Sequence, residues 1–268
     1  MGGIAKILSI AGSDPSGGAG IQADLKTFAA LGCYGMAAIS ALTAQNTQGV
    51  RAVSMVAPDF LAQQIEAIFA DIDVDAVKIG MIGAPDNARV IGAALSSARA
   101  KNIVLDPVLV ATSGHELGGD VMVAPLQKMF PLARLVTPNL IEAARLAGGQ
   151  GANAVEDMRA LALRLHGLGA AAVLVKGGHL AEGDALDLLY DGEDFIEFTA
   201  PRVATRNTHG TGCALSSAIA ALLGTGRGLR EAVGEAKAWL TRALQAGAAL
   251  RIGAGHGPPD HFCDFRRS

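Results

Sequence analysis

Short runs of β-branched and aliphatic residues alternate with helix-like segments along this chain, and this alternation most limits what it can fold into. Residues 4–10 have the composition of a buried strand, and residues 21–31 repeat apolar side chains at helical spacing. Pro58 opens a similar helical pattern. Alternating strands and helices form an open parallel sheet between two helical layers, so we predict a three-layer α/β/α fold with a mostly parallel central sheet.

The same alternation continues along the chain, so we predict a single domain over residues 1–268. Two segments around Asp191-Gly192 have the pattern of an antiparallel hairpin, which predicts a small antiparallel edge. We predict further strands over residues 36–44, 76–79, 103–105, 135–137 and 171–176, and further helices over 85–99, 124–130, 140–146, 155–165, 213–223 and 229–246.

The charge of the chain argues against a polyanionic partner. Lys and Arg number 22 against 25 Asp and Glu, a formal net charge of −3 at pH 7, and no run of five like charges occurs. A nucleic-acid backbone or an acidic membrane surface would favour a basic chain. We therefore expect a small-molecule partner, with no nucleic acid and no membrane.

The three cysteines indicate a reducing compartment. Cys33, Cys213 and Cys263 are odd in number, lie far apart and include no Cys-x-x-Cys pair, which argues against a disulfide framework and a structural zinc site. The apolar run near the N-terminus is too short for a secretory signal. We expect a cytoplasmic protein.

The segment 207–213 (NTHGTGC) predicts an anion-binding turn. Small and apolar residues follow it with the pattern of a helix. At such a helix start, the backbone N–H groups of Gly210, Thr211, Gly212 and Cys213 can converge on a phosphate. The alternative is a simple turn in which Thr211 caps the helix.

Three more polar groups follow predicted strands. Asn139 and Glu142 suit a hydrated Mg²⁺, or alternatively form a helix-capping pair. Lys176 would place a cation at a strand end; the alternative is a lysine whose side chain extends toward solvent. Asp106 would place a carboxylate at a strand end; the alternative is a residue that stabilises a turn. Because the carboxyl ends of parallel strands share one edge of the sheet, these groups and the turn together suit Mg-assisted phosphoryl transfer. The sequence contains no Gly-Lys pair, which excludes the P-loop as its phosphate site.

Several segments together resemble the hydroxymethylpyrimidine/phosphomethylpyrimidine kinases of thiamine biosynthesis, in the ribokinase-like superfamily. The resemblance runs from about residue 4 to the final helix. It implies a ribokinase-like fold, a homodimer, and ATP- and Mg²⁺-dependent phosphorylation of an aminopyrimidine alcohol and then of its monophosphate. The segments that carry it are AGSDPSGGAGIQADLKTF (11–28), TAQNTQGV (43–50), KIGM (78–81), TPNLIEA (137–143), KGGH (176–179) and NTHGTGCALSSAIA (207–220).

The resemblance also implies roles for individual residues. Gln45 would hydrogen-bond the aminopyrimidine, because an amide both donates and accepts. Lys176 would neutralise phosphate oxygens, and Gly210 to Cys213 would form the anion hole. Other positions would line the substrate pocket (Gly12, Asp24 and Met81), bind Mg-ATP (Asp106, Asn139, Glu142 and Thr208) or hold the magnesium ion itself through water (Asp106 and Glu142).

Cys213 stands where the wider superfamily has an aspartate base. A thiol at a helix start can have a depressed pKa and serve as the base, or it can simply pack as a small buried side chain. Both interpretations stay open at the level of sequence. For His209 in the same turn, shaping the turn is the favoured role. We expect residues 112–119 to close over the reaction, or to be a passive connection.

Two other functions compete with the thiamine-pathway kinase. The first is a pyridoxal-type vitamin kinase of the same fold. Pyridoxal-phosphorylating relatives carry a second cysteine in the lid, where this chain has VATSGH (110–115). The second is a non-catalytic pyrimidine or nucleotide sensor. A sensor that only binds its ligand would not need every group that stabilises negative charge during phosphoryl transfer, and this chain has all of those groups.

Overall fold

Parallel strands form the centre of the molecule. The computed structural model describes residues 3–109, 118–149, 151–178 and 183–265. Its main sheet has eight strands in the order β10-β9-β8-β7-β6-β5-β1-β2, and among them β9 runs opposite to the others. The strands are β1 (Lys6–Ala11), β2 (Tyr34–Ile39), β5 (Ala76–Ile79), β6 (Ile103–Leu105), β7 (Leu135–Val136), β8 (Val173–Lys176), β9 (Ala185–Tyr190) and β10 (Phe195–Ala200).

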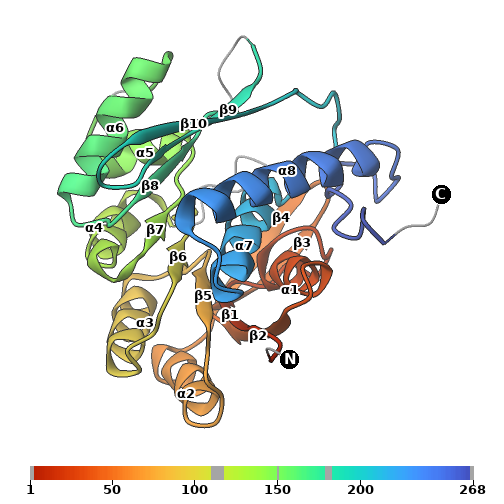
Figure 1. The fold of residues 1–268 in the computed structure, drawn as a ribbon. Helices are drawn as coiled ribbons and strands as arrows, with labels where there is room; N and C mark the ends of the chain where they lie inside the picture. The colour runs from red at the N-terminus through yellow and green to blue at the C-terminus, as the bar shows by residue number, and fades with distance from the viewer. Residues whose placement is uncertain (1–2, 110–117, 150, 179–182, 266–268) are drawn as a thin grey trace.

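Helices cover both faces of this sheet, as Figure 1 shows. One layer contains α1 (Gly20–Ala30), α7 (Thr211–Gly224) and α8 (Leu229–Gly247). The other contains α2 (Pro58–Phe69), α3 (Pro85–Ser97), α4 (Val123–Gln127), α5 (Leu140–Ala147) and α6 (Val155–Gly167), with the 3₁₀ turns η1 (Gly119–Met122) and η2 (Phe130–Leu132) beside α4. The predicted three-layer architecture with an antiparallel edge is confirmed.

Two apolar cores hold the layers together because strand side chains alternate between the faces. In β1, Leu8 and Ile10 belong to the core under α2 to α6, whereas Ile7 belongs to the core under α1, α7 and α8. In β6, Leu105 and Val104 divide in the same way. Strands buried on both faces explain why the sequence shows continuous apolar runs.

The strand predicted over residues 36–44 is confirmed as far as Ile39, where β2 ends, but its continuation to residue 44 is wrong. The chain leaves the sheet at Ser40, whose N–H donates to the Ala11 carbonyl at 3.0 Å and whose hydroxyl donates to the Met81 carbonyl at 2.6 Å. A separate antiparallel hairpin follows, made of β3 (Ala41–Asn46) and β4 (Gly49–Met55). Its pairing register shifts between Ala44 and Gln45, an irregularity that changes the direction of nearby side chains.

The chain after α8 returns to this hairpin. The N–H groups of Gly255 and His256 donate to the hydroxyl and the carbonyl of Thr47, at 3.2 and 2.9 Å. The Gly257 carbonyl accepts the N–H of His209 at 3.0 Å. Residues 253–257, here called the C-terminal strap, therefore join the hairpin turn to the loop that precedes α7.

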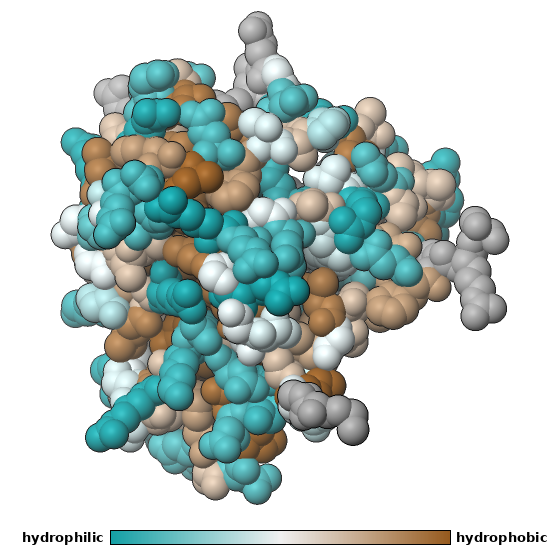
Figure 2. Space-filling model, viewed as in Figure 1, coloured by the Kyte–Doolittle hydropathy of each residue, from teal (hydrophilic) through white to brown (hydrophobic). Residues whose placement is uncertain are grey.

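Hydrophilic and hydrophobic residues are interspersed on the face drawn in Figure 2. Among the described residues, no helix has both the length and the apolar character that crossing a membrane requires.

Candidate active site

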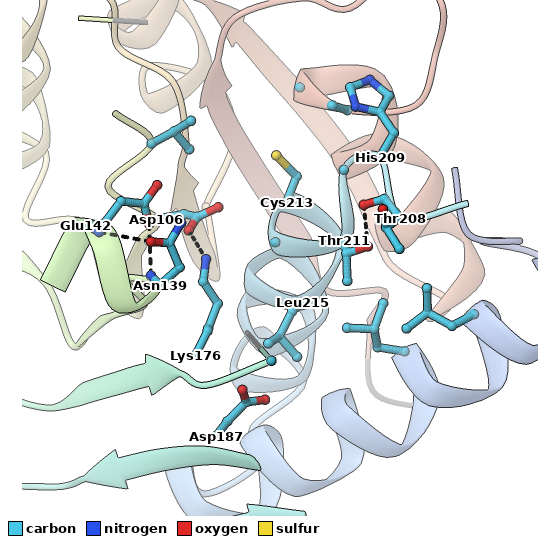
Figure 3. Close-up of a pocket in the computed structure, with 18 of the residues that line it drawn as sticks. Asp106, Asn139, Glu142, Lys176, Asp187, Thr208, His209, Thr211, Cys213 and Leu215 are labelled. Carbon is cyan, nitrogen blue, oxygen red and sulfur yellow. Dashed lines mark hydrogen bonds and ion pairs between the residues drawn. The ribbon is translucent and has the colours of Figure 1, made fainter. Parts of the chain in front are cut away.

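A cavity of about 700 Å³ opens along the carboxyl edge of the main sheet. Its walls include Gly12 after β1, Lys78 of β5, Asp106 after β6, Asn139 after β7 and Lys176 at the end of β8. Successive parallel strands thus deliver polar groups to one place, which is where ligands of such sheets bind. Figure 3 shows part of this cavity, with the β7 and β8 side facing the start of α7.

The structure brings together nearly all the residues singled out from the sequence. Those that line the cavity are Gly12, Gln45, Met81, Asp106, Asn139, Glu142, Lys176, Thr208, Gly210, Thr211, Gly212 and Cys213. Asp24 is not among the lining residues.

Asp106 and Lys176 form a buried ion pair. The Lys176 Nζ lies 2.7 Å from Asp106 Oδ1, the hydroxyl of Thr137 also donates to this carboxylate at 3.2 Å, and the Ser216 hydroxyl lies 3.2 Å from it. Burial alone would raise the pKa of Asp106, but the positive charges of Lys176 and Lys78 lower it. Lys176 therefore does not extend toward solvent; its ammonium is held inside the cavity.

Asn139 and Glu142 form the capping box that was one interpretation of the sequence, and they also line the cavity. The Glu142 N–H donates to Asn139 Oδ1, and the Asn139 N–H donates to Glu142 Oε2, both at 2.9 Å. Burial raises the pKa of Glu142 to about 7; the charge of Lys176 opposes this shift and that of Asp106 adds to it.

The carboxylates of Asp106 and Glu142 lie in this buried space with the ammonium of Lys176, and the charge of Lys78 also acts on Asp106. A hard divalent cation would supply positive charge there, and carboxylate oxygens are suitable ligands for it. No group of three or more His, Cys, Asp or Glu suited to a metal occurs in the described part of the chain. The two carboxylates fit a cation held by few protein ligands, as Mg²⁺ usually is.

The start of α7 is open toward the cavity. Gly210 is its N-cap, with a φ of 74°, and no side chain caps the helix. A Cβ at Gly210 would collide with the Gly18 carbonyl oxygen, so only glycine fits at this approach of two loops. Thr211 does not cap the helix, because its hydroxyl donates to the Thr208 carbonyl at 2.6 Å.

One of the four expected anion-binding amides is used within the turn. The Thr211 N–H donates to the Thr208 carbonyl at 3.2 Å, a hydrogen bond that holds the turn closed. The amides of Gly212 and Cys213 belong to the first helical turn, which has no acceptors within its own helix. They carry the positive end of the α7 dipole toward the cavity.

The depressed pKa considered for Cys213 is not what the structure gives. Burial raises the pKa of the Cys213 thiol to about 11, although the charge of Lys78 and the N–H of Gly20 act in the opposite direction. The nearby carboxylates of Asp24 and Asp106 add to the increase. A helix start lowers the pKa of a thiol, but here this effect is smaller than the increase caused by removing water from around the sulfur.

Asp24 lies beneath the cavity in a fully buried ion pair with Lys78. Lys78 Nζ contacts both Asp24 oxygens at 2.9 Å, and neither side chain is exposed. The hydroxyls of Ser9 and Ser217 donate to the same carboxylate at 2.6 and 2.7 Å. These bonds connect β1, α1, β5 and α7 and leave Asp24 buried below the cavity wall. Lys78, which was not singled out from the sequence, lines the cavity instead.

The opposite end of the cavity contains Gln45, Met81 and His209. His209 Nε2 lies 2.8 Å from Asp14 Oδ2 and 3.2 Å from the Gln45 side-chain amide. Burial alone would raise the pKa of Asp14, but hydrogen bonds from His209 and Ser16 lower it to about 2. His209 thus joins two loops, which is the shaping role favoured from the sequence.

A further buried ion pair lies on the side formed by β9 and α8. Lys237 Nζ donates to Asp187 Oδ2 at 2.7 Å, and Lys237 and Leu240 line the cavity there. Trp239 is 2% exposed and packs in the core. The loop predicted to close over the site, residues 112–119, falls largely outside the described residues, as does His179.

The fold and this cavity define a phosphotransferase with a ribokinase-like fold. A helix start that can bind an anion, a buried ammonium and two carboxylates surround one space at the carboxyl edge of the sheet. Comparison with known proteins then narrows the class: the chain belongs to the phosphomethylpyrimidine kinase family, whose model matches residues 14–260.

Named relatives agree with this family. The chain is 51% identical over 256 residues to the hydroxymethylpyrimidine/phosphomethylpyrimidine kinase of Rhizobium meliloti, covering 95% of this chain and 96% of that protein. It is 50% identical to a thiamine biosynthesis bifunctional protein of Geobacter sulfurreducens, of which it spans only 52%. Its fold is similar to the pyridoxal kinase of Staphylococcus aureus in complex with AMP-PCP and pyridoxal, with a TM-score of 0.90, 35% identity, and 99% and 96% of the two chains covered.

Proposed function

We propose that this chain transfers the γ-phosphoryl group of ATP to the hydroxyl of hydroxymethylpyrimidine, and then to the resulting monophosphate, giving the diphosphate. One observation carries the proposal: Lys176, the start of α7 and Gln45 line a single cavity. Phosphoryl transfer depends mainly on positioning and on stabilising negative charge, and this cavity supplies groups for both.

Each group has a proposed part in the reaction. The amides of Gly212 and Cys213 and the ammonium of Lys176 would stabilise the transferring phosphoryl group. Gln45 would bind the edge of the aminopyrimidine, with Gly12 and Met81 against its ring. The nucleotide would lie along Asn139, Thr208 and the side that contains Lys237 and Leu240.

Asp106 and Glu142 would hold Mg²⁺, partly through water. The ion would supply positive charge to the phosphate oxygens, which is its usual contribution to phosphoryl transfer.

The decisive experiment is incubation of the protein with Mg-ATP and hydroxymethylpyrimidine. The products are separated by anion exchange at successive times. We expect the monophosphate first and the diphosphate later. Absence of any phosphorylated product would reject the kinase and leave the sensor function.

The fold similarity to a pyridoxal kinase makes pyridoxal the second candidate acceptor. Competition between the two alcohols for limiting enzyme measures the preference directly. We expect hydroxymethylpyrimidine to be used with the higher kcat/KM, because the curated relative with 51% identity is named for the pyrimidine.

Magnesium dependence should vary with pH through Glu142. Its pKa of about 7 keeps the carboxyl protonated in more acidic solution, and a protonated carboxyl binds the ion poorly. Between pH 6 and pH 8 the ionised fraction rises about tenfold, so the apparent affinity for Mg²⁺ should rise by a similar factor. Titration of activity with MgCl₂ at both pH values measures this. Glu142→Gln is the control for ionisation of ATP itself, and the same pH response in this variant would contradict the prediction.

We propose Cys213 as the base for the first phosphorylation. With a pKa raised to about 11, its thiolate fraction grows as pH increases, so kcat for the alcohol should rise from pH 7 to pH 9. Cys213→Ala should remove this slope and reduce kcat about 100-fold.

The second phosphorylation provides an internal control for Cys213. A phosphate monoester is already ionised near pH 8, because its second pKa is about 6. Cys213→Ala should therefore slow the second step much less than the first. An equal loss in both steps, in a folded variant, would instead assign Cys213 a packing role.

The homodimer, the cytoplasmic location and the single-domain organisation remain predictions. Sedimentation velocity of the purified chain tests the first.

A further inference from the structure

Gln45 has two neighbours that together determine which way its amide points. As placed in the structure, the amide oxygen Oε1 lies 3.3 Å from Thr43 Oγ1, and the amide nitrogen Nε2 lies 3.2 Å from His209 Nε2. A half-turn about the last side-chain bond exchanges the oxygen and nitrogen of an amide, so the protons on the neighbours decide the orientation.

Thr43 can only accept from Gln45. A hydroxyl has one proton, and that of Thr43 is donated to the Ser13 carbonyl at 2.8 Å, the shorter of its two contacts. A carbonyl oxygen cannot donate in return. The end of the Gln45 amide that faces Thr43 must therefore be the NH₂ group.

His209 cannot accept from Gln45. Its Nε2 lies 2.8 Å from Asp14 Oδ2. Backbone N–H groups of Ser16, Gly18 and Ala19 also donate to this carboxylate, which keeps it ionised. Because an ionised carboxylate only accepts, the proton lies on His209 Nε2 and points to Asp14, the shorter of its two contacts. A protonated ring nitrogen has no lone pair to accept a Gln45 N–H, so the end of Gln45 that faces it must be the oxygen.

The two requirements are independent and agree. We propose that Asp14, His209 and Thr43 fix the Gln45 amide with its oxygen toward His209 and its NH₂ toward Thr43, and that this orientation determines which acceptor the site selects. These residues are positioning residues, since they act through Gln45. The second half of the proposal, the selection of an acceptor, rests on the proposed function.

The packing around His209 is consistent with a fixed ring. A Cβ at Gly18 would collide with the imidazole, so the loop passes directly against it, and the C-terminal strap holds the His209 backbone. His209 is 7% exposed, which limits competition from water.

An amide held in this way recognises a ring edge with a donor toward His209 and an acceptor toward Thr43. An aminopyrimidine has such an edge, because its exocyclic amine adjoins a ring nitrogen. The ring hydroxyl of pyridoxal does not adjoin its ring nitrogen, so pyridoxal cannot make the same pair of bonds through that nitrogen. A pyrimidine turned over would reverse donor and acceptor and move its hydroxymethyl group to the other side of the ring.

The first test needs no substrate and no activity. In full-length protein with ¹⁵N-labelled histidine, the long-range ¹H–¹⁵N spectrum reports which ring nitrogens carry protons, and the spectrum of His209→Phe identifies the His209 signals. We expect a protonated Nε2. An unprotonated Nε2 would overturn the proposal, whatever the enzyme phosphorylates.

The second test is kinetic and uses two matched pairs. His209→Phe and Thr43→Val should each raise the KM for hydroxymethylpyrimidine about tenfold, the effect of losing a hydrogen bond of ordinary strength, and reduce the preference over pyridoxal. The KM for ATP should stay within about twofold. His209→Gln retains a donor and Thr43→Ser retains the hydroxyl, so both should restore most of the affinity.

Thr225→Val is the control for the loss of a threonine hydroxyl. Its hydroxyl also donates to a carbonyl, that of Leu222 at 2.8 Å, but it lies outside the cavity, so the acceptor KM should not change. An unchanged acceptor KM in both His209→Phe and Thr43→Val would overturn the proposal. If the wild-type protein phosphorylates neither alcohol, the proposed function fails, and the histidine spectrum alone decides the amide orientation.

Discussion

Replacement of Lys176 by Met is expected to reduce kcat about 1,000-fold, within the range found when a single group that stabilises phosphoryl or oxyanion charge is removed. Lys176 ends β8, and its ammonium lies 2.7 Å from Asp106. At this place it would neutralise charge on the transferring phosphoryl group. Steady-state rates with saturating Mg-ATP and hydroxymethylpyrimidine measure the effect. The KM for ATP should change much less than kcat, because the missing charge matters most in the transition state.

Lys237→Met is a matched control for this variant. It also removes an ammonium from a 2.7 Å ion pair in the wall of the same cavity, but on the β9 and α8 side. It should therefore affect the KM for ATP more than kcat. If the two variants had the same kinetic effect, Lys176 would have no special part in the transfer.

Replacement of Lys78 by Met is expected to lower the free energy of unfolding by about 3–5 kcal/mol, the usual result of leaving one member of a buried ion pair without its partner. Asp24 would keep the hydroxyls of Ser9 and Ser217 but lose both contacts to the ammonium. Urea unfolding followed by circular dichroism gives the value.

The double variant Lys78→Met/Asp24→Asn separates the charge from the packing. Asparagine removes the uncompensated charge and can still accept from a serine hydroxyl, so the double variant should be more stable than Lys78→Met alone. Arg242→Ala, which breaks the exposed pair with Asp264, should cost less than about 1 kcal/mol. Additive effects of the Lys78 and Asp24 substitutions would show that the two charges do not interact.

The positions of the polar groups at the strand ends could be predicted from the sequence because they follow from local patterns. Asp106, Asn139 and Lys176 each come directly after or at the end of an apolar strand, and parallel strands place those ends together. The start of α7 could be predicted for the same reason, since a turn-forming segment precedes a long apolar helix.

Contacts between distant segments could not be predicted in this way. The Asp24–Lys78 pair joins residues that lie 54 positions apart, and no local spacing indicates it. The β3–β4 hairpin was missed because residues 36–44 are mostly apolar and resemble one strand, whereas the break at Ser40 depends on bonds to Ala11 and Met81. The raised pKa of Cys213 depends on burial, which becomes visible only in three dimensions.

The C-terminal strap has a consequence for the order in which the working protein is assembled during translation. Every strand of the main sheet lies before residue 201, so the sheet can form while residues 253–257 are still unsynthesised. Until those residues emerge from the ribosome, the turn at Thr47 and the backbone of His209 lack the bonds that join them. A nascent chain would thus acquire its scaffold first and the fixed spacing between its two ligand-facing loops last.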